Sequence, residues 1–257
     1  MVPALPLLLQ HGITALLDVI YPRRCEGCET SLEFGRVKAE RWLCDDCVDG
    51  LPRIVPPFCD VCGEPYDGAI SGAFRCANCT DLNLRFDFAV SAYRADGLVR
   101  ELVHRFKYNR QQHLSGVLGA LLADVLQDPR LSPQPGPPAV LVPVPLHHAR
   151  RREREFNQAW ELCRELSKRT HIPALDVLRR VRPTTTQASL TRNQRIENLR
   201  GAFRVRDRVL RNGELKGKTI LLVDDVLTTG STASECARTL RRDAGVEKIV
   251  VITVARG

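Results

Sequence analysis

The 257-residue chain has no apolar run long enough to cross a membrane. A transmembrane helix needs about 18 or more consecutive apolar residues, and the apolar N-terminal segment falls short of that. This segment also lacks a basic start and a small-residue cleavage site, which argues against a secretory signal. Its leucines and isoleucines recur with helical spacing, which predicts an amphipathic helix over residues 1–24. We therefore expect a cytoplasmic protein.

Aromatic residues are scarce, whereas positive charge is abundant. Only 5% of the residues are Phe, Trp or Tyr, which weakens the case for a dedicated platform on which single-stranded bases stack. The formal net charge of +8 favours anionic partners such as nucleotides, pyrophosphates or nucleic acid, but does not choose among them. The length allows one sizeable domain and a small one.

A Walker phosphate loop is also missing, although GELKGKT, Gly213 to Thr219, looks like one. The Walker pattern places four residues between its glycines, follows a strand and opens a helix. Here three residues separate Gly213 from Gly217, and the segment leads into a strand pattern. We expect a surface turn, which disfavours an NTPase.

Cysteine is nearly absent after residue 79, and its concentration before that point divides the chain in two. Eight of the ten cysteines form four C-x-x-C pairs: Cys25, Cys28, Cys44, Cys47, Cys59, Cys62, Cys76 and Cys79. Fifteen residues separate Cys28 from Cys44 and thirteen separate Cys62 from Cys76, near the spacing of four-cysteine zinc sites. The other two cysteines, Cys163 and Cys236, lie in helical patterns and are expected to be small core residues.

Two structural Zn²⁺ ions explain these pairs better than disulfides do. A disulfide framework would need an oxidising compartment. The region also has few large apolar residues, so metal must supply much of its folding free energy. The simplest pairing gives two consecutive zinc ribbons over residues 25–81, although the spacing leaves a cross-braced pairing open.

From Phe86 onward, strand and helix patterns alternate. Apolar or alternating segments predict strands over 86–93, 140–145, 218–225 and 248–255, and helical periodicity covers 97–107, 114–126, 157–170 and 231–243. Such alternation predicts a parallel α/β domain, here over residues 82–257.

The segment TILLVDDVLTTGST, Thr219 to Thr232, predicts the ligand site of this domain. Ligands of open parallel sheets bind beyond the carboxyl ends of the strands, which places Asp224 and Asp225 at the rim. Carboxylates there are suited to ribose hydroxyls, and the turn after them offers backbone N–H groups and a helix start to a phosphate. An ordinary loop with a helix N-cap would leave the paired acids unexplained. A ribose carrying a phosphate explains the whole segment.

Residues 220–232 resemble the phosphoribosyl-pyrophosphate (PRPP) binding motif of type I phosphoribosyltransferases. Further segments are similar to those of the ComF family, whose members join a double zinc ribbon to such a domain: FKYNRQQH from Phe106, VPVPLHHARRRERE from Val142, FNQA from Phe156 and TTTQASLTRNQRIENLRGAF from Thr184. The resemblance spans nearly the whole chain. It implies a type I phosphoribosyltransferase-like parallel sheet flanked by helices, with an N-terminal double zinc-ribbon domain.

The resemblance also implies residue roles. Asp224 and Asp225 would be the catalytic carboxylates, holding the ribose hydroxyls directly or through Mg²⁺. The PRPP-binding residues would be Val226, Leu227, Thr228, Thr229, Gly230, Ser231 and Thr232 in the phosphate turn, Val144, Pro145, Leu146 and His147 in the pyrophosphate loop, and Arg150, Arg151, Arg152 and Lys107. The residues of a flexible loop that closes over substrate would be Gln187, Arg192, Arg195 and Asn198.

One position departs from the family. Glu155 stands where glycine is usual, and a carboxylate side chain there disfavours a turn with positive φ.

Two functions remain open. The first is Mg²⁺-dependent transfer of a phosphoribosyl group from PRPP to an unidentified acceptor, with release of pyrophosphate. The second, implied by the association of ComF-like proteins with DNA uptake, is non-catalytic handling of nucleic acid by a fold that binds PRPP or single-stranded DNA. Ten Lys and Arg against five Asp and Glu between Arg150 and Arg182 suit either function.

Overall fold

The computed structural model describes residues 23–32, 42–70, 72–80, 83–131, 139–146, 154–182 and 198–257. The chain forms two compact units, Met1–Leu51 and Pro52–Gly257. In the first unit the described helix is α2 (Asp45–Asp49), which begins directly after a cysteine. The amphipathic helix predicted over residues 1–24 lies outside the described residues, except for its last two positions.

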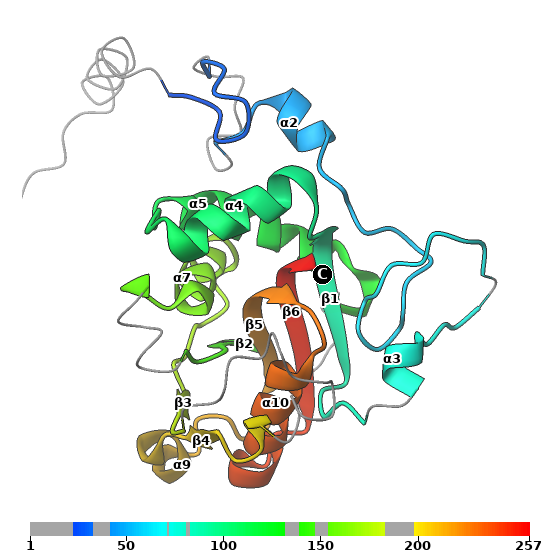
Figure 1. The fold of residues 1–257 in the computed structure, drawn as a ribbon. Coiled ribbons are helices and arrows are strands. Elements are labelled where there is room, and N and C mark those ends of the chain that lie inside the picture. The colour runs from blue at the N-terminus through cyan, green and yellow to red at the C-terminus, as the bar shows by residue number, and fades with distance from the viewer. Residues whose placement is uncertain are drawn as a thin grey trace, which may run out of the picture. The chain divides into compact units, whose positions relative to one another are not determined.

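A four-stranded sheet forms the centre of the second unit (Figure 1). Its strands are β1 (Phe88–Arg94), β2 (Ala139–Pro143), β5 (Thr219–Leu227) and β6 (Lys248–Arg256). The spatial order is β1-β6-β5-β2, and all three pairings are parallel. The predicted parallel α/β architecture is therefore confirmed.

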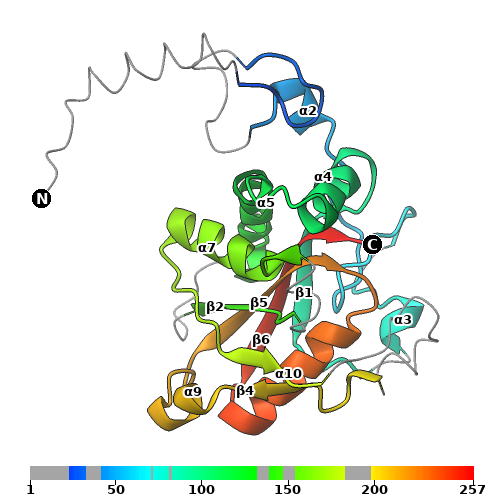
Figure 2. The same cartoon turned by 60° about the vertical axis from the view of Figure 1, so that its left-hand side comes forward.

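Helices cover both faces of the sheet (Figure 2). One face carries α4 (Gly97–Tyr108), α5 (Leu114–Ala123) and α7 (Gln158–Thr170), and the other carries α10 (Ser231–Ala244). Shorter elements complete the unit: α3 (Ala77–Thr80), η1 (Asp124–Gln127), η2 (Pro129–Leu131), β3 (Leu178–Arg180), β4 (Phe203–Val205) and α9 (Asp207–Asn212). Because both faces are covered, the strands are apolar along nearly their whole length.

The core explains why the central strands form where they do. Ile220 and Leu222 of β5 join the core cluster that includes Cys236 and Leu240 of α10. Side chains alternate between the faces of a strand, so the intervening residues of β5 point to the face that α7 covers. Cys163 is fully buried in α7 and Cys236 in α10, which confirms the prediction that they are core residues.

Two features differ from the sequence-based expectations. β5 runs on to Leu227, two residues beyond the predicted end at residue 225, so the paired aspartates lie inside the strand rather than at its end. An antiparallel hairpin of β3 and β4 was not predicted, because three-residue strands are too short to show a period.

The boundary between the two compact units also differs from the boundary between residues 81 and 82 that the cysteine distribution predicts. The boundary lies between Leu51 and Pro52, so the second group of C-x-x-C pairs shares a unit with the sheet. Whether residues 25–81 and 82–257 act as separate domains stays a prediction. Among the described residues, none of the helices has the length and apolar character needed to span a bilayer.

Candidate functional site

The paired aspartates of β5 occupy different environments. Asp225 is buried, with 5% of its surface exposed, whereas Asp224 keeps part of its surface exposed. An oxygen of the Asp224 carboxylate accepts a hydrogen bond of 2.9 Å from the backbone N–H of Asp225. Partial burial of this carboxyl group, together with the neighbouring charge of Asp225, raises the pKa of Asp224 to about 7. This carboxyl group therefore changes its charge near neutral pH.

A lysine from another element compensates the second aspartate. Lys107, in the last turn of α4, places Nζ 2.8 Å from Oδ1 of Asp225. Burial opposes the charge of the ammonium group, but the carboxylates of Asp225 and Asp224 outweigh it and raise the pKa of Lys107. Lys107 therefore stays protonated beside β5. The helix that carries it, α4, thus brings a positive charge to the paired aspartates.

The turn after β5 is shaped to expose backbone N–H groups. Gly230 has a φ of 74° and directly precedes α10. The hydroxyl oxygens of Thr229 and Ser231 lie 3.0 Å apart across the turn. The first N–H groups of a helix lack an intrahelical acceptor and carry the positive end of the helix dipole. The turn can therefore receive an anionic group such as a phosphate.

The loop after β2 begins next to this strand. The N–H of Val144 donates to the carbonyl oxygen of Val223 on β5 at 2.9 Å, and the Asn157 side chain donates to the carbonyl oxygen of Val144 at 3.2 Å. Val144 and Pro145 are buried and Leu146 is half-buried. His147, Arg150, Arg151 and Arg152 lie outside the described residues.

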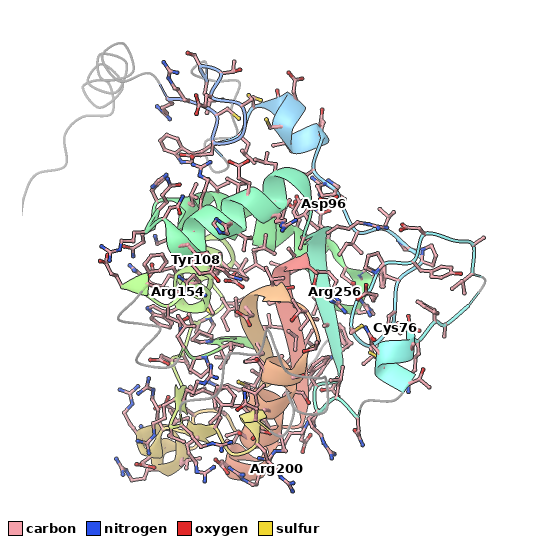
Figure 3. All side chains as sticks on the ribbon, viewed as in Figure 1. Cys76, Asp96, Tyr108, Arg154, Arg200 and Arg256 are labelled. Carbon is pink, nitrogen blue, oxygen red and sulfur yellow. The ribbon has the colours of Figure 1, made fainter. Side chains whose placement is uncertain are left out.

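The structure adds an arginine that sequence reasoning missed. Arg154 is buried and donates to the hydroxyl of Tyr108 and to Oε1 of Gln158, both at 3.3 Å. Its guanidinium lies over the Tyr108 ring, 5.0 Å from the centroid, and Figure 3 shows the two side chains together. The sequence signal that could have indicated it is its position directly before Glu155, where the chain departs from the family pattern. The positive charge of Arg154 acts on both Lys107 and Asp224.

Glu155 adopts the turn that its side chain was expected to disfavour. Its φ is 68°, and its carboxylate pairs with Arg110 at 2.9 Å between two exposed side chains. The turn that glycine would allow is therefore kept, at the cost of backbone strain.

The proposed flexible loop is described only at its ends. Arg182 donates to the carbonyl oxygens of Asn198 at 3.0 Å and Arg200 at 2.7 Å. The N–H of Gly201 donates to Glu235 of α10 at 2.6 Å. The first two bonds join the two ends of this segment to each other, and the third joins its C-terminal end to α10. Gln187, Arg192 and Arg195 lie outside the described residues.

The eight N-terminal cysteines gather in two groups of four. Cys25, Cys28, Cys44 and Cys47 form the first cluster, and Cys59, Cys62, Cys76 and Cys79 form the second. The predicted consecutive pairing is confirmed, and the cross-braced alternative is excluded for these residues. Within each cluster the sulfur atoms lie within 4.8 Å of one another.

Both clusters fit tetrahedral zinc. Four thiolates at about 2.3 Å from Zn²⁺ lie about 3.8 Å apart, and the Sγ atoms of Cys28 and Cys44, and those of Cys62 and Cys76, are separated by 3.5 Å. Backbone N–H groups donate to Sγ of Cys25 and Cys59, which suits thiolate ligands.

Comparison with known proteins agrees with this architecture. Residues 16–80 match a family model described as a double zinc ribbon domain, and residues 159–257 match the phosphoribosyl transferase domain. Competence protein F of Haemophilus influenzae is 33% identical over 91% of this chain and 96% of its own length. DNA utilization protein YhgH of Escherichia coli is 30% identical over 86% of this chain and 92% of its own. Competence protein ComFC of Bacillus subtilis is 24% identical, with 86% of each chain covered.

Together, the two cysteine clusters, the parallel sheet with its phosphate-turn motif, and relatives aligned over nearly their full length place this chain in the ComF family, in which a double zinc ribbon precedes a phosphoribosyltransferase domain.

Proposed function

We propose that this protein binds Mg²⁺–PRPP at the carboxyl end of β5 and transfers its phosphoribosyl group to an acceptor. The observation that carries the proposal is the continuity of β5 and α10. Two carboxylates are followed within a few residues by a glycine with a φ of 74° and a helix start. A pentose with a 5′-phosphate needs acceptors for its hydroxyls and donors for its phosphate in that order.

Different groups of residues would bind different parts of PRPP. The turn from Thr228 to Thr232 would hold the 5′-phosphate, and Asp224 and Asp225 would accept from the ribose hydroxyls. The loop from Val144 to His147, with Arg150, Arg151 and Arg152, would face the pyrophosphate. Gln187, Arg192, Arg195 and Asn198 would close over the substrate.

Carboxylate oxygens are the donors that Mg²⁺ prefers. Asp224 and Asp225 provide this donor type. One oxygen of Asp225, Oδ1, is already paired with the ammonium group of Lys107. Bound Mg²⁺ would supply positive charge to the leaving pyrophosphate. The chain itself would orient the ribose through the two carboxylates and exclude water by closing the loop whose base Arg182 fixes.

In the transfer, the bond between the anomeric carbon and pyrophosphate breaks, the acceptor atom forms a bond to that carbon, and the acceptor loses its proton. Because positive charge develops on the sugar and negative charge on pyrophosphate, the site must position and stabilise charge. It needs no protein nucleophile.

Titration calorimetry with Mg²⁺–PRPP tests the binding. Asp224→Asn and Asp225→Asn should each weaken affinity about ten- to hundredfold, because each removes a charge-assisted hydrogen bond. Asp207→Asn on α9 is the matched control, since Asp207 is exposed and lies 3.9 Å from its nearest cationic partner. If the double Asn variant binds PRPP as tightly as the wild type, this assignment fails. A screen for pyrophosphate release across candidate acceptors tests turnover.

Handling of single-stranded DNA is a second candidate, favoured by the names of the relatives, which are competence and DNA utilization proteins. Ten basic against five acidic residues between Arg150 and Arg182 would support electrostatic binding. Affinity should then fall with a log–log salt slope of about −0.7 per phosphate neutralised. PRPP binding without pyrophosphate release from any acceptor would favour this second function.

We also place the protein in the cytoplasm. None of the ten cysteines forms a disulfide, and eight of them are arranged as zinc ligands, which is typical of proteins in a reducing compartment.

A further inference from the structure

The guanidinium of Arg256 joins the second cysteine cluster to the end of β5. Arg256 is 4% exposed at the end of β6, and Figure 3 shows it on the side of the sheet where Cys76 lies. Its Nε donates to the carbonyl oxygen of Cys62 at 3.1 Å, and Nη2 lies 3.7 Å from Sγ of the same cysteine. Its Nη1 donates to the carbonyl oxygen of Leu227 at 2.9 Å.

Leu227 is the last residue of β5, so its carbonyl marks the entrance of the phosphate turn. The same oxygen accepts a second hydrogen bond of 2.9 Å from the N–H of Gly257. Both donors come from the last two residues of the chain. The direction in which the chain leaves β5 is therefore set by Arg256, which also contacts the cysteine cluster, and by its neighbour Gly257.

Apolar contacts also connect the second cysteine cluster to the turn after β5. Leu84 packs both against the second cluster and against the main core. A Cβ placed on Gly230 would lie 3.6 Å from Cδ2 of Leu84, so the leucine borders the centre of the turn. The N–H of Arg85 also donates to the Ser234 hydroxyl of α10 at 3.0 Å. The chain that leaves the cluster thus covers the first turn of this helix.

Charge explains why the arginine can be buried there. Four thiolates around one Zn²⁺ carry a net charge of two minus, and Glu64 pairs with Arg256 as well. A buried cation is stable only when it is paired and hydrogen-bonded. Without the metal, the Cys62 segment would lose the geometry that presents its sulfur and carbonyl oxygen to the guanidinium.

We propose that the second zinc site positions the phosphate turn through Arg256, so that zinc at this site and PRPP at the turn are energetically coupled. The proposal rests on the function proposed above for its ligand, but the link itself lies within the protein. By linkage, each ligand then strengthens the binding of the other by the same factor. The first cluster belongs to the other compact unit and provides the comparison.

Hydrogen exchange of the full-length zinc-loaded protein tests the link without any ligand. Arg256→Gln and Cys62→Ser should both raise amide exchange over residues 227–232. Arg94→Gln is the matched control, because Arg94 pairs in register with Arg256 on the neighbouring strand but bonds exposed Asp67. Cys28→Ser is the control for loss of zinc from the first cluster. Zinc content should be about two equivalents for Arg256→Gln and Arg94→Gln and about one for each cysteine variant.

Calorimetry with Mg²⁺–PRPP supplies the second measurement. Arg256→Gln should weaken affinity about tenfold or more, as expected for loss of a charged hydrogen bond, and Arg94→Gln should not change it. Unchanged exchange over residues 227–232 in Arg256→Gln and Cys62→Ser would overturn the proposal. If wild-type protein binds no PRPP, the proposed function fails, and the exchange measurement alone then decides the link.

Discussion

Lys107 Nζ lies 2.8 Å from Asp225 Oδ1, and these two side chains are only 20% and 7% exposed. The pair joins the last turn of α4 to β5 beside the proposed ribose site. Side chains alternate along a strand, so Asp225 faces α4 while Asp224 points the other way. The two acids of the motif therefore differ in environment: the charge of Asp225 is compensated by Lys107, whereas Asp224 has a pKa of about 7 and can change its charge near neutral pH.

Loss of the lysine should destabilise the fold. Lys107→Met leaves Asp225 buried without its cation, and removing one partner of a buried pair costs about 3 kcal/mol or more. Urea denaturation measures this change. Arg179→Met, which breaks the exposed pair with Asp207, should cost less than about 1 kcal/mol. Adding Asp225→Asn to Lys107→Met should restore most of the lost stability. Equal effects of the two single variants would contradict the burial of the Lys107 pair.

Proton release should accompany ligand binding at Asp224. With a pKa of about 7, raised by burial and by Asp225, about half of these carboxyls are protonated at neutral pH. A ligand that requires the carboxylate then releases about half a proton at pH 7. Its affinity should rise from pH 6 to pH 8. Calorimetry in two buffers of different ionisation enthalpy measures the release, and Asp224→Asn should reduce it. Release that is unchanged in this variant would assign the proton to another group.

The same carboxyl has the opposite effect on folding stability. Its folded-state pKa lies above its ordinary value of 3.8, so the folded protein binds this proton more tightly than the unfolded chain. Its contribution to stability is therefore present at low pH and is lost as the pH rises from about 4 to about 7. The difference in unfolding free energy between wild type and Asp224→Asn should change across that interval.

Gly230→Ala should separate backbone strain from ligand binding. Gly230 and Gly213 have φ values of 74° and 61°, so alanine at either position costs about 1 kcal/mol of stability. Contacts add little to this cost, because a Cβ at Gly230 would lie 3.5 Å from Phe86 and one at Gly213 would meet no atom within 4 Å. Only Gly230→Ala should weaken Mg²⁺–PRPP binding, by about tenfold. Equal affinities of the two variants would remove Gly230 from the phosphate site.

Glu155 provides a test of strain at the position where the family usually has glycine. Glu155→Gly relieves a φ of 68° and loses an exposed ion pair with Arg110, whereas Glu155→Ala loses the pair and keeps the strain. The glycine variant should therefore be more stable than the alanine variant by about 1 kcal/mol in urea denaturation. An alanine variant of equal stability would show that the turn stores no strain.

Local patterns in the sequence determined the elements of this protein and much of its proposed site. The C-x-x-C pairs, the alternation of strand and helix, and the order of strand, carboxylates and phosphate turn over residues 220–232 all lie within short stretches. Neighbours in such stretches remain neighbours in space, so their spacing carries the geometry.

Only the tertiary structure decided how these stretches meet. Four features join residues that are distant in the sequence. They are the grouping of the C-x-x-C pairs into two clusters, the contact of Lys107 with Asp225, the burial of Arg154 beside Tyr108 and the bond from Arg256 to Cys62. The last three of these depend on the strand order β1-β6-β5-β2 and on the helices that cover each face of the sheet. Periodicity shows which face of a strand or helix is buried, but not which element covers that face, because that choice depends on packing across the whole core.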